Sequence, residues 1–279
     1  MTSTARQIPG TLVTLPLPGT KRTLDGFWTS GRRRAATLLI FVHGMGSNFY
    51  KSKFKKALLT SGPRHSIDVL SFNNRGCEGD VADERFIDCL DDIDAALAFA
   101  RQQGYRHVFL LGHSTGCQKI TFHTARRRDP RVKGLILAAL GDDLAIAQRD
   151  LGRAYPTWLA KARDLVARGK GDTKLPPKCL GFTARRFLSA VDPTQTEARL
   201  FHLAGPMTTF RRVTLPIFAV FPANEQYACI PVTDAAEILR AKTRSRAFTS
   251  TIIPDADHSF HGQEKTCAET ILRWIAQQR

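Results

Sequence analysis

The sequence predicts an α/β fold, built on a mostly parallel β-sheet with helices on both faces. Short apolar runs rich in β-branched and aromatic residues recur along the 279 residues, as expected of strands buried on both faces. Amphipathic helical patterns separate most of these runs, and this alternation implies right-handed crossovers between parallel strands. Each run is followed by a loop rich in Gly, Asp, Asn or His, so polar chemistry is expected where the strands end.

Six apolar runs are predicted to be strands of this sheet: 37–42, 67–72, 107–111, 132–138, 216–221 and 247–253. Two further runs, 11–17 and 21–28, flank a Pro-Gly-Thr turn and predict an N-terminal hairpin. Apolar residues at helical spacing predict helices over 83–103, 115–128 and 264–278. The first is the clearest, because acidic residues fill its first turn and Gly104 follows its end.

The alternation breaks once, after the strand that ends near Ala139. About seventy residues precede the next strand, too many for a structureless loop in a compact sheet. Segments 154–168 and 182–190 within them have helical patterns. We therefore expect residues 144–209 to form a helical lid over the carboxyl edge of the sheet, as an insertion in a single domain that spans residues 1–279.

The segment Gly112–Gly116 fits the pattern G-x-S-x-G and lies between a predicted strand and a predicted helix. In that context its small residues permit a sharp turn that lifts the hydroxyl of Ser114 above the sheet. The helix N-terminus that follows favours the negative charge that develops when the hydroxyl attacks a carbonyl. Ser114 is the candidate nucleophile, and a structural turn serine is the alternative.

A serine hydroxyl needs a neighbouring base, which is expected late in the chain, after the last strand. His258 meets this expectation, because it follows the apolar run that ends at Ile253 and precedes the final helix. His261 is the competitor, but it lies closer to that helix. Four other histidines lie in helix, strand or lid patterns that favour surface or core roles: His65, His107, His123 and His202.

The third member of such a triad is a carboxylate between the serine and the histidine in sequence. Glu225 directly follows the strand 216–221 and is the first candidate, although aspartate is commoner in this role. Asp142 and Asp143 follow the preceding strand and are the alternatives, since both loops can reach the histidine at the carboxyl edge of the sheet. A helix N-cap is the structural interpretation of this aspartate pair.

An oxyanion hole needs two backbone N–H groups, one of them from the residue after the nucleophile, here Thr115. The other is expected from the loop after an early strand, where His43-Gly44-Met45-Gly46-Ser47 follows strand 37–42. Met45 is the candidate donor, because glycines on both sides let the backbone approach a substrate oxygen. An ordinary Gly-rich turn into a helix near Phe49 is the alternative.

Composition excludes several classes of protein. Six cysteines without a CxxC pair, and eight histidines without HExxH spacing, argue against a metal site or a disulfide framework, so no metal or cofactor is expected. No apolar stretch is long enough to span a membrane, and the first ten residues lack a signal-peptide pattern, which favours a cytoplasmic protein. The formal charge of +16 favours an anionic partner, yet the short Arg and Lys runs have no nucleic-acid motif beside them, so we interpret them as a solvated surface.

In their order along the chain, the segments HGMGS, NNRGCEG, GHSTG, an acidic loop and ADHSF resemble those of the α/β-hydrolase superfamily. The resemblance implies the α/β-hydrolase fold and a serine esterase activity that needs no cofactor. More narrowly, GHSTGCQ (112–118) is similar to the elbow of a domain-of-unknown-function group that includes fungal siderophore esterases. Glu225 departs from the family pattern, since most relatives have aspartate there.

The expected function is hydrolysis of a small or medium carboxylic ester. The positive charge of the protein would favour an ester that has an anionic group. A thioesterase, lactonase or amidase on the same scaffold is the alternative within enzymes, because the fold does not decide the bond. A non-catalytic protein that binds a ligand or nucleic acid is the alternative of another class.

Overall fold

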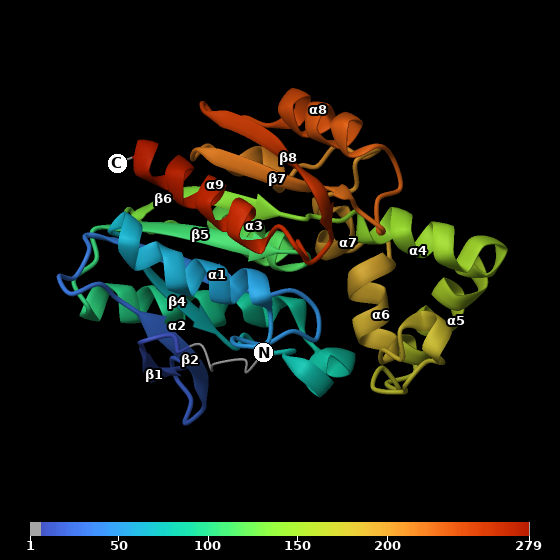
Figure 1. The fold of residues 1–279 in the computed structure, drawn as a ribbon. Coiled ribbons are helices and arrows are strands. Elements are labelled where there is room, and N and C mark those ends of the chain that lie inside the picture. The colour runs from blue at the N-terminus through green and yellow to red at the C-terminus, as the bar shows by residue number, and fades with distance from the viewer. Residues whose placement is uncertain (1–6, 279) are drawn as a thin grey trace, which may run out of the picture.

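The sheet is the centre of the molecule (Figure 1). The computed structural model describes residues 7–278, so residues 1–6, part of the segment in which no signal peptide is expected, lie outside the described residues. Within them the sheet has eight strands in the order β1-β2-β4-β3-β5-β6-β7-β8. Strands β3 to β8 are parallel, and β2 pairs antiparallel with both β1 and β4. The strands are β1 (Thr11–Pro16), β2 (Thr23–Thr29), β3 (Thr37–Val42), β4 (Asp68–Phe72), β5 (His107–His113), β6 (Val132–Ala138), β7 (Ile217–Asn224) and β8 (Phe248–Asp257).

The predicted strands and the N-terminal hairpin are confirmed. Every residue of β3 is buried, as its continuous apolar run predicts for a central strand covered on both faces. Strands β7 and β8 extend beyond the predicted ends, to Asn224 and Asp257. These extensions bring the two strands to the residues just before Glu225 and His258, so both side chains start from the same edge of the sheet.

Helices form one layer on each face of the sheet (Figure 1). Helices α1 and α9 pack on one face through residues such as Leu58 and Ile271. Helices α2, α3 and α8 pack on the other through residues such as Ile93, Ile120 and Leu239. The bounds are α1 (Lys53–Ser61), α2 (Cys89–Gln102), α3 (Gly116–Arg126), α8 (Val232–Lys242) and α9 (Glu264–Gln277). The predicted helices at 115–128 and 264–278 are thereby confirmed within two residues at each end.

The predicted start of the helix at 83–103 is wrong. The α-helix begins at Cys89, and the preceding segment contains two short 3₁₀ turns, Glu78–Asp83 and Phe86–Asp88. Glu84 lies between these turns with its side chain buried in an ion pair with Lys119. Asp92, in the observed first turn of α2, binds Arg75 at 2.6 Å. The helix near Phe49 likewise begins later, at Lys53.

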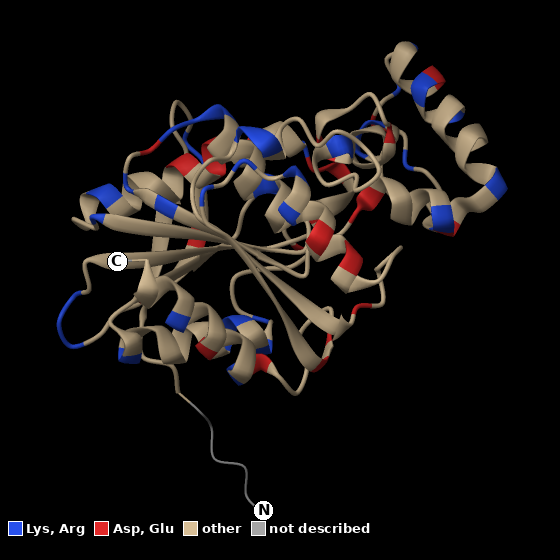
Figure 2. Cartoon of the chain, turned by 90° about the horizontal axis from the view of Figure 1, so that it is seen from above, with Lys and Arg blue, Asp and Glu red and all other residues tan. Residues whose placement is uncertain are grey.

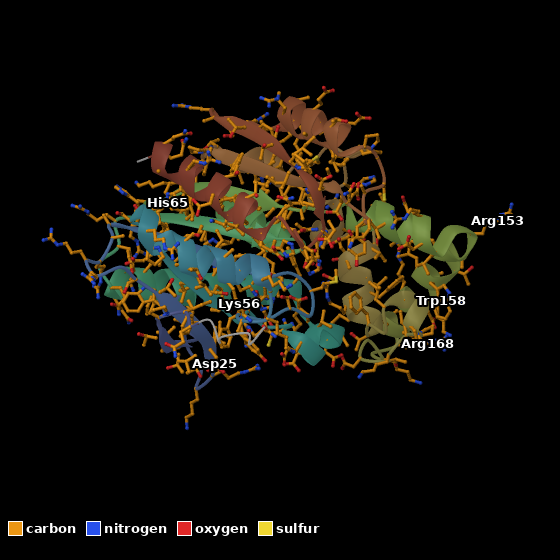
Figure 3. The ribbon with its side chains drawn as sticks, in the orientation of Figure 1. Asp25, Lys56, His65, Arg153, Trp158 and Arg168 are labelled. Atoms are coloured by element: carbon orange, nitrogen blue, oxygen red, sulfur yellow. The ribbon has the colours of Figure 1, made fainter. Side chains whose placement is uncertain are left out.

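Between β6 and β7 lie four α-helices of the described chain, which we call the inserted helices. They are α4 (Asp143–Leu151), α5 (Tyr155–Ala167), α6 (Ala184–Val191) and α7 (Thr196–Leu200). α5 and α6 match the helical patterns in the sequence, whereas α4 and α7 carried no clear signal. Figure 1 shows α4, α5 and α6 grouped at one end of the sheet, and Figure 3 places Trp158, Arg153 and Arg168 on their outer side, away from the strands.

A buried network of four charged side chains joins the inserted helices to the rest of the fold. Arg186 of α6 binds Glu197 of α7 at 2.7 Å and Glu84 at 3.3 Å, and Lys119 of α3 also pairs with Glu84. The exposed fraction of each of these side chains is 2% or less. Two cations therefore balance two anions in a site with little access to water.

Replacing Arg186 with methionine should lower the free energy of unfolding by about 3–5 kcal/mol, because it leaves buried carboxylates without their partner. Arg185→Met is the matched control on the same helix, since Arg185 pairs with Asp172 at the surface, where 55% and 80% of the two side chains are exposed. An exposed pair of this kind contributes about 1 kcal/mol or less. Urea unfolding of both variants measures the difference, and equal losses would contradict the importance of the buried network.

Candidate active site

Ser114 lies in a strained turn between β5 and α3. Its φ is +55°, a left-handed conformation that costs a non-glycine residue roughly 1–2 kcal/mol. The neighbouring glycines make the turn possible by close approach: a Cβ on Gly116 would lie 2.1 Å from the carbonyl oxygen of Val42. A Cβ on Gly112 would lie 2.4 Å from the carbonyl of Gly116. The G-x-S-x-G pattern thus reflects how tightly β3, β5 and α3 pack around the serine.

His258 follows β8 directly and contacts Glu225, which follows β7. The Nδ1 atom of His258 lies 2.9 Å from each carboxylate oxygen of Glu225. Because a carboxylate only accepts, Nδ1–H donates in this bond, which leaves Nε2 as the atom able to take a proton. The Glu225 side chain is 5% exposed, so the bond is well shielded from water.

Three other groups fix the imidazole and its backbone. The Nε2–H of His113 donates to the carbonyl oxygen of His258 at 2.8 Å. Burial and then the nearby charge of His258 lower the pKa of His113 to about 3, so His113 stays neutral and keeps donating. The side chain of Gln226 accepts a hydrogen bond from the backbone N–H of His258 at 3.1 Å. The ring of Tyr227 packs edge-on against the imidazole of His258, with the two ring centroids 4.7 Å apart. The sequence interpretation missed these residues, although His113 is the variable position just before the serine and could have been considered.

The other candidate residues have different partners. Asp142 accepts from Ala145 N at 3.0 Å, which makes it the N-cap of α4, and it also binds His202 at 3.1 Å. Asp143 accepts from Gln118 at 3.0 Å. His261 pairs with Asp257 at 2.7 Å on the surface, where 63% of the histidine side chain is exposed. Of the three carboxylates considered from the sequence, Glu225 is the one that contacts His258.

Ser114 and His258 line a single cavity of about 420 Å³. Ser114 Oγ forms no hydrogen bond within the described residues, and such bonds in ligand-free active sites often form only when substrate arrives. The inserted helices contribute an apolar wall that includes Ile146, Phe187 and Val191. The cavity is therefore open to a small molecule that has both an apolar part and a polar centre.

Met45 and Thr115 also line this cavity, beside the serine. A Cβ on Gly44 would lie 3.2 Å from Thr115 N and 2.8 Å from the Cβ of Ser114, so the loop after β3 touches the serine turn. Within residues 7–278, the backbone N–H groups of Met45 and Thr115 donate to no other group. Both donors are free to bind an oxygen atom in the cavity.

Residues 7–278 contain neither a metal-binding cluster nor a helix able to cross a membrane. No group of three or more His, Cys, Asp and Glu side chains is placed to hold a metal ion. None of the helices has the length and apolar character that crossing a bilayer requires. Lys and Arg positions are distributed over loops and helices throughout the molecule, not along one stretch (Figure 2).

The model of the α/β hydrolase family matches residues 39–270, so the chain belongs to this family and has its fold, as the sequence predicts. No curated protein matches the sequence. Among solved structures, a siderophore hydrolase, EstB, from Aspergillus fumigatus is 19% identical, with 98% of this chain and 99% of that chain covered and a TM-score of 0.74.

Two bacterial structures are also similar. Est1E from Butyrivibrio proteoclasticus, with ferulic acid bound, is 15% identical over 95% of this chain and 98% of that chain, with a TM-score of 0.69. A thermostable carboxyl esterase from Bacillus coagulans, in complex with glycerol, is 14% identical over 96% of this chain and 98% of that chain, with a TM-score of 0.69. At these identities the likeness shows the fold, and the chemistry has to be argued from the site.

Proposed function

We propose that this protein is a serine hydrolase that cleaves carboxylic esters through an acyl-enzyme, with Ser114 as nucleophile, His258 as base and Glu225 as the acid of the triad. The observation that carries the proposal is the cavity into which both the strained serine and the histidine open, with Glu225 bound to the far side of the imidazole. A structural turn serine would have no need of a hydrogen-bonded histidine and carboxylate beside it.

In the proposed reaction, Nε2 of His258 takes the proton of Ser114 while Oγ bonds to the ester carbonyl carbon. The N–H groups of Met45 and Thr115 hold the resulting oxyanion. As the intermediate collapses, the C–O bond to the alcohol breaks and the alcohol leaves with the proton from His258. Water then attacks the acyl-enzyme, gives its proton to His258 and releases the acid, which restores Ser114.

Esters are the favoured substrates because the structural neighbours described above include a carboxyl esterase and a siderophore hydrolase. A cavity of about 420 Å³ suits a small or medium substrate, since ligand pockets commonly measure roughly 300–1,000 Å³. The net charge of +16 would attract an anionic ester toward it. A siderophore-type ester belongs to the same proposal as a narrower candidate, supported by the similar elbow sequence and the EstB neighbour.

A panel of esters, thioesters, lactones and amides tests the proposed bond, with acyl groups of matched length and with siderophore-type esters included. We expect ester turnover to exceed turnover of the matched amide and thioester. A higher rate on any of the other three classes would reassign the activity within serine hydrolases. Absence of turnover on the whole panel would favour a binding protein on this scaffold.

A further inference from the structure

Asp143 is a carboxyl group of the cavity wall that the proposed triad does not use. It is the first residue of α4, is half-buried, and lines the same cavity as Ser114 and His258. Its Oδ2 atom accepts a hydrogen bond from Nε2 of Gln118 at 3.0 Å. Its other oxygen, Oδ1, has no hydrogen-bond partner among the described residues.

The surroundings of Asp143 supply no counter-ion for its carboxylate. No Lys, Arg or His side chain of the described chain forms an ion pair with it. Arg186 is the nearby cation, but it is already bound to Glu84 and Glu197 in the buried network. Because that network is balanced without Asp143, an ionised Asp143 would add an uncompensated negative charge beside Glu197 and Asp142.

The pKa of Asp143 agrees with this charge balance. Burial, followed by the carboxylate of Glu197, raises the pKa to about 8, and Asp142 adds to the increase. Arg186 and the hydrogen bond from Gln118 act in the opposite direction and are outweighed. Near neutral pH the carboxyl is therefore mostly protonated, and since Gln118 donates to Oδ2, the proton resides on Oδ1, the oxygen without a partner.

We propose that Asp143 is a specificity-determining residue whose neutral carboxyl donates a hydrogen bond from Oδ1 to an uncharged oxygen, such as an ether or carbonyl oxygen, of the bound ester. This inference rests on the proposed function and adds a substrate class to it. The preferred substrate has an oxygen-bearing group at a distance from the scissile bond, where a plain alkyl ester has only CH₂ groups. Above the pKa the carboxylate can no longer donate, and the preference disappears.

The test compares 4-nitrophenyl esters of straight-chain acids with esters of equal length in which an ether oxygen replaces one CH₂, moved stepwise along the chain. The ratio of kcat/KM for each ether and alkyl pair cancels any effect of pH on the triad itself. At a pH of about 6.5, we expect the ether-to-alkyl ratio of kcat/KM to be roughly threefold to tenfold higher in the wild type than in Asp143→Leu at one position of the ether oxygen. This difference corresponds to the gain of one hydrogen bond. At a pH of about 9.5, the wild-type ratio should fall to that of Asp143→Leu, because the carboxyl is then ionised.

Asp143→Asn is the decisive variant, since an amide N–H donates at every pH. It should keep the ether preference at both pH values, and this readout does not depend on whether the leucine variant folds. A wild-type ratio equal to that of the leucine variant at all positions would overturn the proposal, and so would a fall of the Asn ratio with pH. Preference of the wild type for a trimethylammonium-bearing ester at a pH of about 6.5, lost in Asp143→Leu, would overturn it in favour of a carboxylate that binds a cation. Absence of any Ser114-dependent ester hydrolysis would instead refute the proposed function.

Discussion

Ser114→Ala is expected to lower kcat on the best ester of the panel by a thousandfold or more, because the hydroxyl that forms the acyl-enzyme is removed. Steady-state rates on purified protein measure the loss. The thermal unfolding temperature should stay within a few degrees of the wild type, since the substitution removes one oxygen that has no hydrogen-bond partner in the described chain. The loss of activity would then be chemical and not structural.

The double variant Ser114→Ala/His258→Ala provides the control for this assignment. Residues of a triad act as a unit, so the double variant should be about as slow as either single variant. His261→Ala is the matched histidine control three residues away, and it should retain wild-type turnover within about twofold. If the fold-losses of kcat in the two single variants multiplied in the double variant, Ser114 and His258 would not act in the same step.

Glu225→Gln is expected to reduce kcat by roughly ten-thousandfold, the size of loss that follows when a triad acid is replaced by its amide. The amide keeps the size of the side chain but can present an N–H group to Nδ1 of His258. The imidazole would then place its proton on Nε2, the atom that must accept the proton of Ser114. Initial rates on a saturating ester, with KM measured separately, show whether the loss lies in kcat.

Two control variants separate this role from a general effect of removing a charge. Asp257→Asn changes a similar carboxylate–histidine pair, the one with His261, and should change kcat by about twofold or less. Asp142→Asn tests the alternative acid, and we expect a much smaller loss of kcat than for Glu225→Gln. A larger loss in Asp142→Asn would move the acid to the loop after β6.

The fold could be predicted from the sequence where a strand is buried on both faces. Strands such as β3 and β5 are buried along nearly their whole length, so their apolar runs are unambiguous. The start of α2 was predicted too early because the sequence does not show which partner a charged side chain will have. Glu84 looks like an acid of a first helical turn, but it pairs with the buried Lys119. The short helix α7 was missed because five residues are too few to show a helical period.

The candidate site was predictable up to the choice of acid. Ser114, His258, Met45 and Thr115 follow from local patterns beside strands. Parallel strands bring the loops after β6 and β7 to the same edge, so Asp142 and Asp143 stayed open as alternatives to Glu225 until the structure showed that Glu225 contacts the histidine. The environment of Asp143 could not be predicted, because it depends on α3, α6 and α7, which meet only in the folded chain.

Reaction with a fluorophosphonate, followed by mass spectrometry of the intact protein and of its peptides, tests the nucleophile most directly. We expect one covalent adduct per chain, located on Ser114, and no adduct in the His258→Ala variant or in unfolded protein. An unmodified wild-type protein, or an adduct on another residue, would contradict the assignment of this serine and the mechanism built on it.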